Sequence, residues 1–298
     1  METLSHCPIC NATQFTQFIE CMDYTVSRET FQIVQCNNCS FKFTNPRPTE
    51  NEMGRYYESD DYISHSNSRK GLFNLAYQAV RNFALKRKLK LIESFHSQEK
   101  NLIDIGCGTG EFLGKANDTG WKTIGLEPSE NARKYATEQN KLTVYDLDYL
   151  KEIKPQSFDV ITMWHVLEHV PNLQEFIPQL KDILKDYGTL LIAVPNCNAY
   201  ESKIYNVTWA AYDVPRHLNH FNKETINKLL ITNGLVVKNI IPMPFDAFYI
   251  SMLSEKYKGA GFIRMAFNGF INGLKSNRKS KTDVNLASSL IYEIKKEI

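Results

Sequence analysis

The stretch Leu-Ile-Asp-Ile-Gly-Cys-Gly-Thr-Gly-Glu-Phe-Leu at residues 102–113 constrains this chain more than any other. It begins with apolar residues typical of a buried parallel strand, breaks into glycines at every second position, and continues with residues that favour a helix. Glycines let the backbone approach a ligand closely, and the start of a helix offers unpaired N–H groups. A strand, a glycine turn and a helix in this order predict a cofactor site.

The spacing of the glycines distinguishes this turn from a dinucleotide-binding turn. Gly106, Gly108 and Gly110 read G-x-G-x-G, whereas the dinucleotide fingerprint reads G-x-G-x-x-G and holds a pyrophosphate. Asp104, just before the glycines, suits a ligand that carries an ammonium group. Glu127, at the end of the next predicted strand, stands where an acid holds the two hydroxyls of a ribose. An ammonium group, a ribose and no phosphate together describe S-adenosylmethionine (SAM).

These residues resemble motifs I and II of the class I SAM-dependent methyltransferases. The resemblance implies that Asp146, after the third strand, accepts a hydrogen bond from the adenine amino group. It also implies that His165, after the fourth strand, contacts the methionine part of SAM or acts as a general base. The predicted cofactor-binding residues are Asp104, Gly106, Cys107, Gly108, Thr109, Gly110, Glu127, Pro128, Asp146, Leu147 and His165.

Hydrophobic periodicity along the rest of the chain predicts an α/β fold. The expected strands are 101–105, 122–126, 142–145, 157–163, 189–194, 235–241 and 287–295. The expected helices are 73–95, packed on the sheet, and 129–139, 173–184 and 223–232. Asp186-Tyr187-Gly188 should end the third of these helices. The resemblance implies a Rossmann-like seven-stranded sheet whose last strand is antiparallel.

Two C-x2-C pairs near the N-terminus, Cys7 with Cys10 and Cys36 with Cys39, predict a metal site. Four thiolates close a tetrahedral zinc site, and the strand-like residues before the second pair are typical of a zinc ribbon. The gap between the pairs exceeds the roughly 15–20 residues of common ribbons, so we expect a loop near residues 22–28. Reduced cysteines without metal and a redox role are the alternatives. Cys21 is expected in the core rather than in the site.

The chain divides into three predicted segments: a zinc ribbon at 1–48, a helical connector or substrate cap at 49–100, and a methyltransferase domain at 101–298 with a helical insert at 242–285. The tyrosines within residues 56–62 line a substrate pocket, cap the sulfonium by cation–π contact, or pack between ribbon and core. Residues 259–281 are apolar and then basic. They form a lid, a dimer face or a contact with a membrane surface.

The segment 209–221, after the fifth strand, ends in Pro-Arg-His-Leu-Asn-His-Phe. It resembles the signature of a bacterial methyltransferase group that carries an N-terminal zinc ribbon and is often met in sugar and surface-polysaccharide biosynthesis. Arg216 would clamp a carboxylate or the pyrophosphate of a nucleotide sugar, and His217 or His220 would act as the general base. The structural alternative is that His220 and Phe221 cap the next helix.

Glu168 and His169 match the Glu-His pair of ubiquinone-type O-methyltransferases, some of which bind a divalent metal there. Trp164 and His165 stand where that pattern has its preceding acid. We therefore expect no catalytic metal, and we expect His169 to begin a helix and hydrogen-bond the backbone.

Composition bounds the function. A net charge of +2 over 298 residues argues against a nucleic-acid partner. The N-terminus lacks a basic segment followed by an apolar one, and no apolar run reaches about 18 residues, so a cytoplasmic protein is expected.

The predicted function is methyl transfer from SAM to a small molecule, a sugar or surface-polysaccharide precursor that is nucleotide-linked or lipid-linked. The alternatives are an RNA or protein methyltransferase that docks through the ribbon, and a non-catalytic SAM-binding protein.

Overall fold

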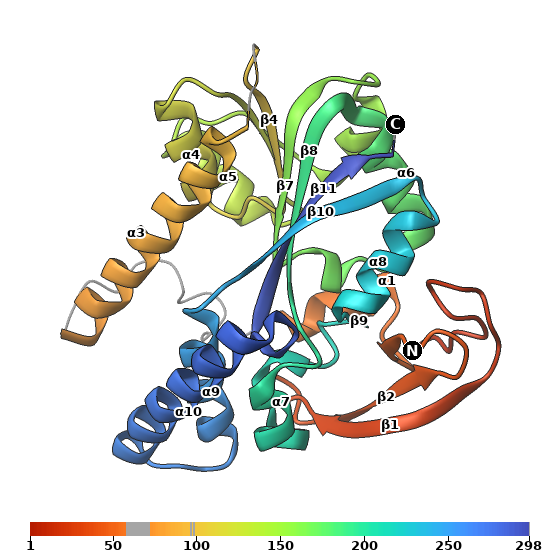
Figure 1. The fold of residues 1–298 in the computed structure, drawn as a ribbon, viewed down its shortest axis with the longest axis vertical. Coiled ribbons are helices and arrows are strands. Elements are labelled where there is room, and N and C mark those ends of the chain that lie inside the picture. The colour runs from red at the N-terminus through yellow and green to blue at the C-terminus, as the bar shows by residue number, and fades with distance from the viewer. Residues whose placement is uncertain (58–71, 96, 98, 298) are drawn as a thin grey trace.

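A seven-stranded sheet forms the centre of the computed structural model, which describes residues 1–57, 72–95, 97 and 99–297 (Figure 1). Its strand order is β10-β11-β8-β7-β4-β5-β6, and β11 runs antiparallel to both of its neighbours. The strands are β4 (Asn101–Ile105), β5 (Lys122–Leu126), β6 (Val144–Tyr145), β7 (Phe158–Trp164), β8 (Leu184–Pro195), β10 (Leu235–Pro242) and β11 (Ser289–Lys296). The predicted Rossmann-like sheet with an antiparallel last strand is confirmed.

Helices cover both faces of this sheet because alternate residues of its strands point to opposite sides. Ile103 and Ile105 of β4 belong to one core, to which α6 and α8 also contribute. Leu102 belongs to a second core, to which α3 and α4 contribute. The helices that follow or precede these strands are α3 (Leu72–Glu93), α4 (Glu111–Asp118), α5 (Glu130–Glu138), α6 (Leu173–Ile183) and α8 (Lys223–Ile231).

Capping residues set the ends of α8. Asn222 accepts a hydrogen bond from the backbone N–H of Thr225 at 2.9 Å, which satisfies one free donor of the first turn. Gly234 takes the left-handed conformation, φ 67°, three residues after the helix ends.

One local prediction is wrong. Asp186-Tyr187-Gly188 does not end α6, because the helix stops at Ile183 and the extended backbone of Leu184 pairs with Phe158, so those three residues lie inside β8. The predicted packing of α3 on the sheet is seen at Leu85, Leu89 and Ile92, whose side chains lie in or against the second core. Ile92 is fully buried, whereas Val80 and Phe83 are 40% and 51% exposed.

The N-terminal ribbon forms a second, four-stranded sheet in the order β1-β2-β3-β9. Its strands are β1 (Phe15–Met22), β2 (Thr30–Cys36), β3 (Lys42–Thr44) and β9 (Asn219–His220), and the short helix α1 (Glu50–Met53) follows β3. Strand β9 comes from the Pro-Arg-His segment, so the ribbon sheet is completed by the methyltransferase part of the chain. Cys21 is buried in the core beneath this sheet, as expected.

The insert between β10 and β11 contains two helices, α9 (Asp246–Tyr257) and α10 (Phe262–Thr282), which contact the short helix α7 (Tyr200–Tyr205). Figure 1 shows this pair extending from one end of the sheet beside α7. Within the described part of the chain, no helix is both long enough and apolar enough to cross a bilayer.

Candidate functional site

The glycine turn lies between β4 and α4, and its three glycines have positive φ angles of 70°, 57° and 82°. A side chain at Gly106 would collide with Val166, and one at Gly110 would collide with Leu142. At Gly108 an added Cβ would meet nothing within 4 Å. The turn is therefore packed tightly at its two ends and open at its middle, where a ligand can approach the backbone.

Two predicted acids meet at this turn. The carboxylate of Glu127 accepts hydrogen bonds from the backbone N–H of Gly108 at 2.8 Å and of Ser129 at 2.9 Å. Asp104 is 2% exposed and accepts a 2.6 Å hydrogen bond from the hydroxyl of Thr162. Burial raises the pKa of Asp104 to about 7. A cationic ligand group beside Asp104 would favour its ionised form, as the ammonium group of SAM requires.

Asp146 follows β6, so the three predicted acids stand at the ends of β4, β5 and β6, which are adjacent in the sheet. Asp146 is half exposed and forms an ion pair with Arg133 at 2.8 Å. Arg133 also donates to the carbonyl oxygens of Glu127 and Pro128, each at 2.7 Å. Arg133 thus joins the ends of two neighbouring strands, a role that the sequence reasoning missed.

Three other predicted cofactor residues lie in the glycine turn or in the segment after β6. Cys107 and Thr109 belong to the glycine turn, and the Thr109 carbonyl oxygen accepts a hydrogen bond from Asn140 at 2.7 Å. Leu147 begins the 3-10 helix after Asp146 and packs against the main core.

A second missed residue, Lys88, lies close to this edge of the sheet. Its Nζ is 4.3 Å from the centroid of the Trp164 ring. Burial lowers the pKa of Lys88, while the charges of Asp104 and Asp246 oppose that effect. Its neighbours Lys86, Arg87 and Lys90 are exposed. Lys88, however, is three residues after Leu85 and four before Ile92, so helical periodicity was the signal that could have placed it inward.

His165 follows β7, as predicted, but two carboxylates surround it. Its Nε2 is 3.1 Å from Asp246 Oδ2 and its Nδ1 is 3.3 Å from Glu168 Oε1. Burial disfavours the charged imidazole, but the hydrogen bonds to Asp246 and Glu168 prevail and raise the pKa of His165 to about 10. At neutral pH His165 is therefore a cation without a basic lone pair. Its expected role as general base does not fit this geometry.

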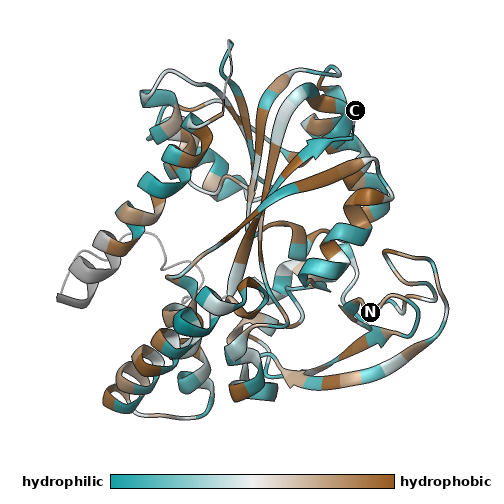
Figure 2. Cartoon of the chain, in the orientation of Figure 1, coloured by the Kyte–Doolittle hydropathy of each residue, from teal (hydrophilic) through white to brown (hydrophobic). Residues whose placement is uncertain are grey.

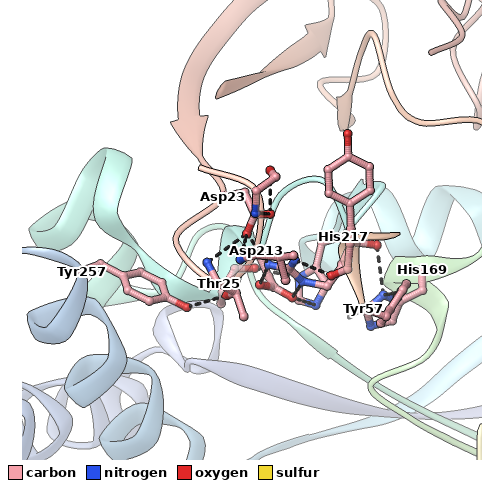
Figure 3. Close-up of polar contacts among 12 residues, drawn as sticks. Asp23, Thr25, Tyr57, His169, Asp213, His217 and Tyr257 are labelled. Atoms are coloured by element: carbon pink, nitrogen blue, oxygen red, sulfur yellow. Dashed lines mark hydrogen bonds and ion pairs between the residues drawn. The ribbon is translucent and has the colours of Figure 1, made fainter. Parts of the chain in front are cut away.

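His169 and His217 lie side by side, with ring centroids 4.7 Å apart (Figure 3). The Nδ1 of His169 is 3.0 Å from the carbonyl oxygen of Arg216 and 3.1 Å from the hydroxyl of Tyr57. The Nδ1 of His217 is 2.9 Å from the carbonyl oxygen of Ala211. Because a carbonyl oxygen only accepts, each Nδ1 carries the proton and each Nε2 carries a lone pair. The Nε2 of His217 also lies 4.0 Å from Asp213 Oδ2, and burial lowers the pKa of His169 to about 4. In its neutral form each ring thus offers Nε2 as a proton acceptor or a metal ligand.

The other tyrosines of the predicted pocket differ from Tyr57. Tyr56 is fully buried and packs edge-on against Phe31, which agrees with the structural alternative for this segment. Tyr62 lies outside the described residues.

The buried position of His220 does not suit a general base. It lies in β9, is 4% exposed, and its Nε2 is 3.1 Å from the hydroxyl of Thr44. Burial holds the pKa of His220 well below its usual value. The residue joins the ribbon sheet to the methyltransferase part, so its expected catalytic role gives way to a structural one.

Arg216 is also structural in this geometry. Its guanidinium donates to Asp213 at 3.0 and 2.7 Å, to Asp23 of the ribbon at 2.9 Å, and to the carbonyl oxygen of Tyr56 at 2.9 Å. Arg216 is 1% exposed and Asp23 is completely buried. Figure 3 shows Asp23 and Asp213 converging on this network. The expected clamp for a substrate carboxylate or pyrophosphate is therefore not supported, because the ribbon already supplies the carboxylate.

Two groups of side chains in the described residues have the composition and spacing to hold a metal ion. The first is Cys7, Cys10, Cys36 and Cys39, and the second is Glu168, His169 and His217. In each group the ligand atoms lie within 4.8 Å of one another. The four thiols fit a closed tetrahedral zinc site, and the second group has two nitrogens and a carboxylate, with each imidazole oriented by a carbonyl oxygen.

We expect the purified protein to retain about one zinc per chain in the cysteine group after dialysis. Elemental analysis measures it. Replacing Cys36 by serine should remove that zinc and lower the melting temperature, whereas replacing Cys21, which lies outside the group, should leave the zinc content unchanged. A Cys36→Ser protein that kept both its zinc and its stability would contradict the assignment.

A hollow of about 620 Å³ lies elsewhere, at the opposite edge of the sheet. It is lined by the first residues of β4, β5 and β7 and by the segment after β6, including Asn101, Lys122 and Phe158. Since the acids and the glycine turn follow the other ends of these strands, this hollow is separate from the candidate cofactor site.

The family comparison identifies a methyltransferase domain over residues 77–239. Among curated proteins, the chain is 27% identical over 158 residues to a ubiquinone biosynthesis O-methyltransferase of Bradyrhizobium diazoefficiens, covering 49% of this chain and 62% of that protein. It is 26% identical over 163 residues to the human mitochondrial protein of the same name, covering 49% of this chain and 44% of that protein. The chain thus spans less than two thirds of the length of either relative. These names do not include the sugar-type group that the Pro-Arg-His segment suggested.

Solved structures share the fold. A SAM-dependent methyltransferase from Archaeoglobus fulgidus aligns with a TM-score of 0.51 and 20% identity, covering 76% of this chain and all of that chain. A geranyl diphosphate C-methyltransferase from Streptomyces coelicolor aligns with a TM-score of 0.53 and 10% identity, covering 78% and 87%. At these identities the likeness concerns the fold alone.

Proposed function

This chain belongs to the class I SAM-dependent methyltransferase family, and from that premise we propose that it transfers a methyl group from SAM to a hydroxyl of a small molecule. The observation that supports the proposal most is the placement of Asp104, Glu127 and Asp146 at the ends of three adjacent strands around the open glycine turn. The names of the curated relatives support an oxygen acceptor.

We assign the parts of SAM by charge. Asp104 receives the ammonium group, Glu127 the ribose hydroxyls and Asp146 the adenine amino group. Lys88 and the cationic His165 flank the same edge and suit the carboxylate of the methionine part. SAM would thus meet an acid at each of its donor groups and a cation at its one anionic group.

In the proposed reaction the acceptor oxygen attacks the methyl carbon of the sulfonium in line with the carbon–sulfur bond. The new carbon–oxygen bond forms as the carbon–sulfur bond breaks, and S-adenosylhomocysteine leaves as a neutral thioether. The hydroxyl proton passes to Nε2 of His217. Since the sulfonium is already activated, most of the rate comes from holding the two partners in line, and the base adds to it.

A second candidate is methyl transfer assisted by a divalent cation, favoured by one observation. The carboxylate of Glu168 is buried, with Oε1 paired to His165 and Oε2 without a hydrogen-bond partner among the described residues, and it lies close to the rings of His169 and His217. Glu168, His169 and His217 would hold the ion, which would make a nearby hydroxyl more acidic. We expected no catalytic metal from the residues next to Glu168 and His169 in the sequence. His217, which completes the group of three, comes from a distant segment.

Two chemical classes of methyl acceptor have support. The resemblance of the Pro-Arg-His segment supports a sugar or surface-polysaccharide precursor, and the names of the relatives support an acceptor of ubiquinone biosynthesis. The burial of Arg216 removes the residue that was expected to hold a nucleotide-sugar pyrophosphate. Turnover on a panel of catechols and nucleotide sugars separates these acceptors. Filter binding to RNA at several salt concentrations tests the nucleic-acid alternative.

Replacing Glu127 by alanine is expected to weaken the binding of S-adenosylhomocysteine by more than tenfold, because a ribose without its charged acceptor loses on the order of 1.5–3 kcal/mol. Isothermal calorimetry measures the change. Glu130→Ala, three residues further along and on the exposed start of α5, is the matched control and should bind normally. Equal affinity of the Glu127→Ala protein and the wild type would remove the ribose assignment. Failure of the wild type to bind would remove the proposed function.

A further inference from the structure

The helical hairpin of α9 and α10 lies outside the residues matched by the methyltransferase family, which end at 239. Its two helices pack closely, because a side chain at Gly269 would collide with Met252 and one at Gly273 with Phe248. The hydroxyl of Ser276 donates to the buried Glu201 of α7 at 2.6 Å and fastens the hairpin to the rest of the molecule. The hairpin is therefore a fixed element with one face turned inward.

The outer face of α10 carries a stripe of exposed apolar side chains. Ile263, Phe267, Phe270 and Leu274 are 84%, 66%, 54% and 45% exposed. Their spacing of four, three and four residues places them along one side of the helix. Figure 2 shows this hydrophobic colouring on α10, away from the sheet. A soluble protein rarely leaves so many large apolar residues together on one surface without use.

Exposed cations accompany the stripe. The cations of this helix are Arg264, Lys275, Arg278, Lys279 and Lys281, all exposed. Arg278 and Lys281 continue the line of the apolar residues beyond Leu274, and the sequence of α10 contains no aspartate or glutamate. The surface is thus apolar along most of its length and positive at its C-terminal end.

Charge decides between two occupants of this surface. A second copy of the chain would cover the apolar stripe, but two copies of α10 would bring cations together with no acid on either helix to offset them. An anionic bilayer satisfies both parts of the surface, since its acyl region takes the apolar side chains and its headgroups take the cations. No described helix can span a bilayer, so the helix would lie in the plane of the interface.

We propose that the stripe of α10 and its basic end dock this protein on the surface of an anionic lipid bilayer. The hairpin begins at Asp246, which pairs with His165 at the cofactor edge. The docking element therefore also forms one side of the candidate active site. A bilayer-borne acceptor would meet the enzyme on that side. The proposal does not depend on the identity of the acceptor.

The test is co-sedimentation of the full chain with lipid vesicles. The protein should bind vesicles containing about one quarter phosphatidylglycerol at least tenfold more tightly than vesicles of phosphatidylcholine alone, and added salt should weaken the binding. Phe267→Glu should lower binding to the anionic vesicles more than tenfold. Changing Arg278 and Lys281 to glutamine should abolish the preference for anionic lipid.

Ile231→Glu is the matched control, because Ile231 is 61% exposed on α8, outside the hairpin. It should bind vesicles as the wild type does. Each variant should also bind S-adenosylhomocysteine with the wild-type affinity, which shows that it is folded. A wild-type protein that does not bind anionic vesicles would overturn the proposal. So would a Phe267→Glu protein that binds them normally, or a wild-type dimer that this change dissociates.

Discussion

Replacing Arg216 by alanine is expected to lower the free energy of unfolding by about 3–5 kcal/mol, the cost of leaving buried carboxylates without their counter-charge. Asp23, on the ribbon, and Asp213, on the methyltransferase part, both depend on this guanidinium. Asp23 is completely buried and cannot turn to water. Chemical denaturation at neutral pH measures the loss. Arg216→Lys should give an intermediate loss, because lysine keeps the charge but not the planar fork.

The matched control is Arg55→Ala, which removes an arginine that is 54% exposed and 3.3 Å from Glu29 in the same region. It should change stability little, because water screens an exposed pair. If Arg216→Ala were as stable as Arg55→Ala, the buried network would not hold the ribbon to the catalytic part.

The pH dependence of the Arg216→Ala loss has a definite sign. Burial works to raise the pKa of Asp23, but the hydrogen bonds from Arg216 and Ser27 hold it below its usual value. A lowered folded-state pKa contributes stability that is present above the unfolded pKa of about 3.9 and is lost as the pH falls through the folded value. Without Arg216 the part of that contribution that comes from its hydrogen bond and its charge disappears. The stability difference between the two proteins should therefore shrink as the pH falls below about 4.

Short patterns in the sequence predicted the features that depend on neighbouring residues. The glycine turn and the strands that meet at it each follow from a few consecutive residue types, so the sequence predicted the residues of the cofactor edge. The two C-x2-C pairs likewise brought four thiols together. In these cases the local backbone alone determines which side chains converge.

The misassigned residues all depend on partners distant in the chain. Arg216 and Asp23 are 193 positions apart, and nothing near Arg216 in the sequence reveals that the ribbon buries it. For His165 the sequence left two roles open, contact with the methionine part of SAM and a general base, and it could not foresee that Asp246 of the insert pairs with the ring. Residue type and loop position predicted polar function, but burial decides whether a charged group is structural or available to a substrate.

Lys88 is a different case, because its signal was present in the sequence. The helix that contains it was predicted, and the residue falls on the apolar side of that helix between Leu85 and Ile92. A cation on a core-facing side, in the helix that leads into the first strand, points toward an anionic group of the ligand. Its basic neighbours Lys86, Arg87 and Lys90 are exposed, so the run as a whole has the composition of a solvated face.

Replacing His217 by alanine is expected to lower kcat by about 10²–10³-fold while the affinity for S-adenosylhomocysteine changes little. The reason is that His217 has a lone pair on Nε2, fixed by the contact of Nδ1 with Ala211, and is not among the residues assigned to the cofactor. Release of S-adenosylhomocysteine with the best acceptor of the panel measures kcat. His220→Gln is the matched control from the same segment and should lower stability but keep most of kcat.

The same variants distinguish a base from a metal ligand. If His217 acts only as a base, a chelator that leaves the cysteine-bound zinc in place should not change wild-type turnover. If it also holds a cation with Glu168 and His169, the chelator should reduce turnover, an added divalent ion should restore it, and Glu168→Gln should lose both the ion and the activity. Wild-type turnover in His217→Ala, or an equal loss in His220→Gln, would show that the proton leaves by another path.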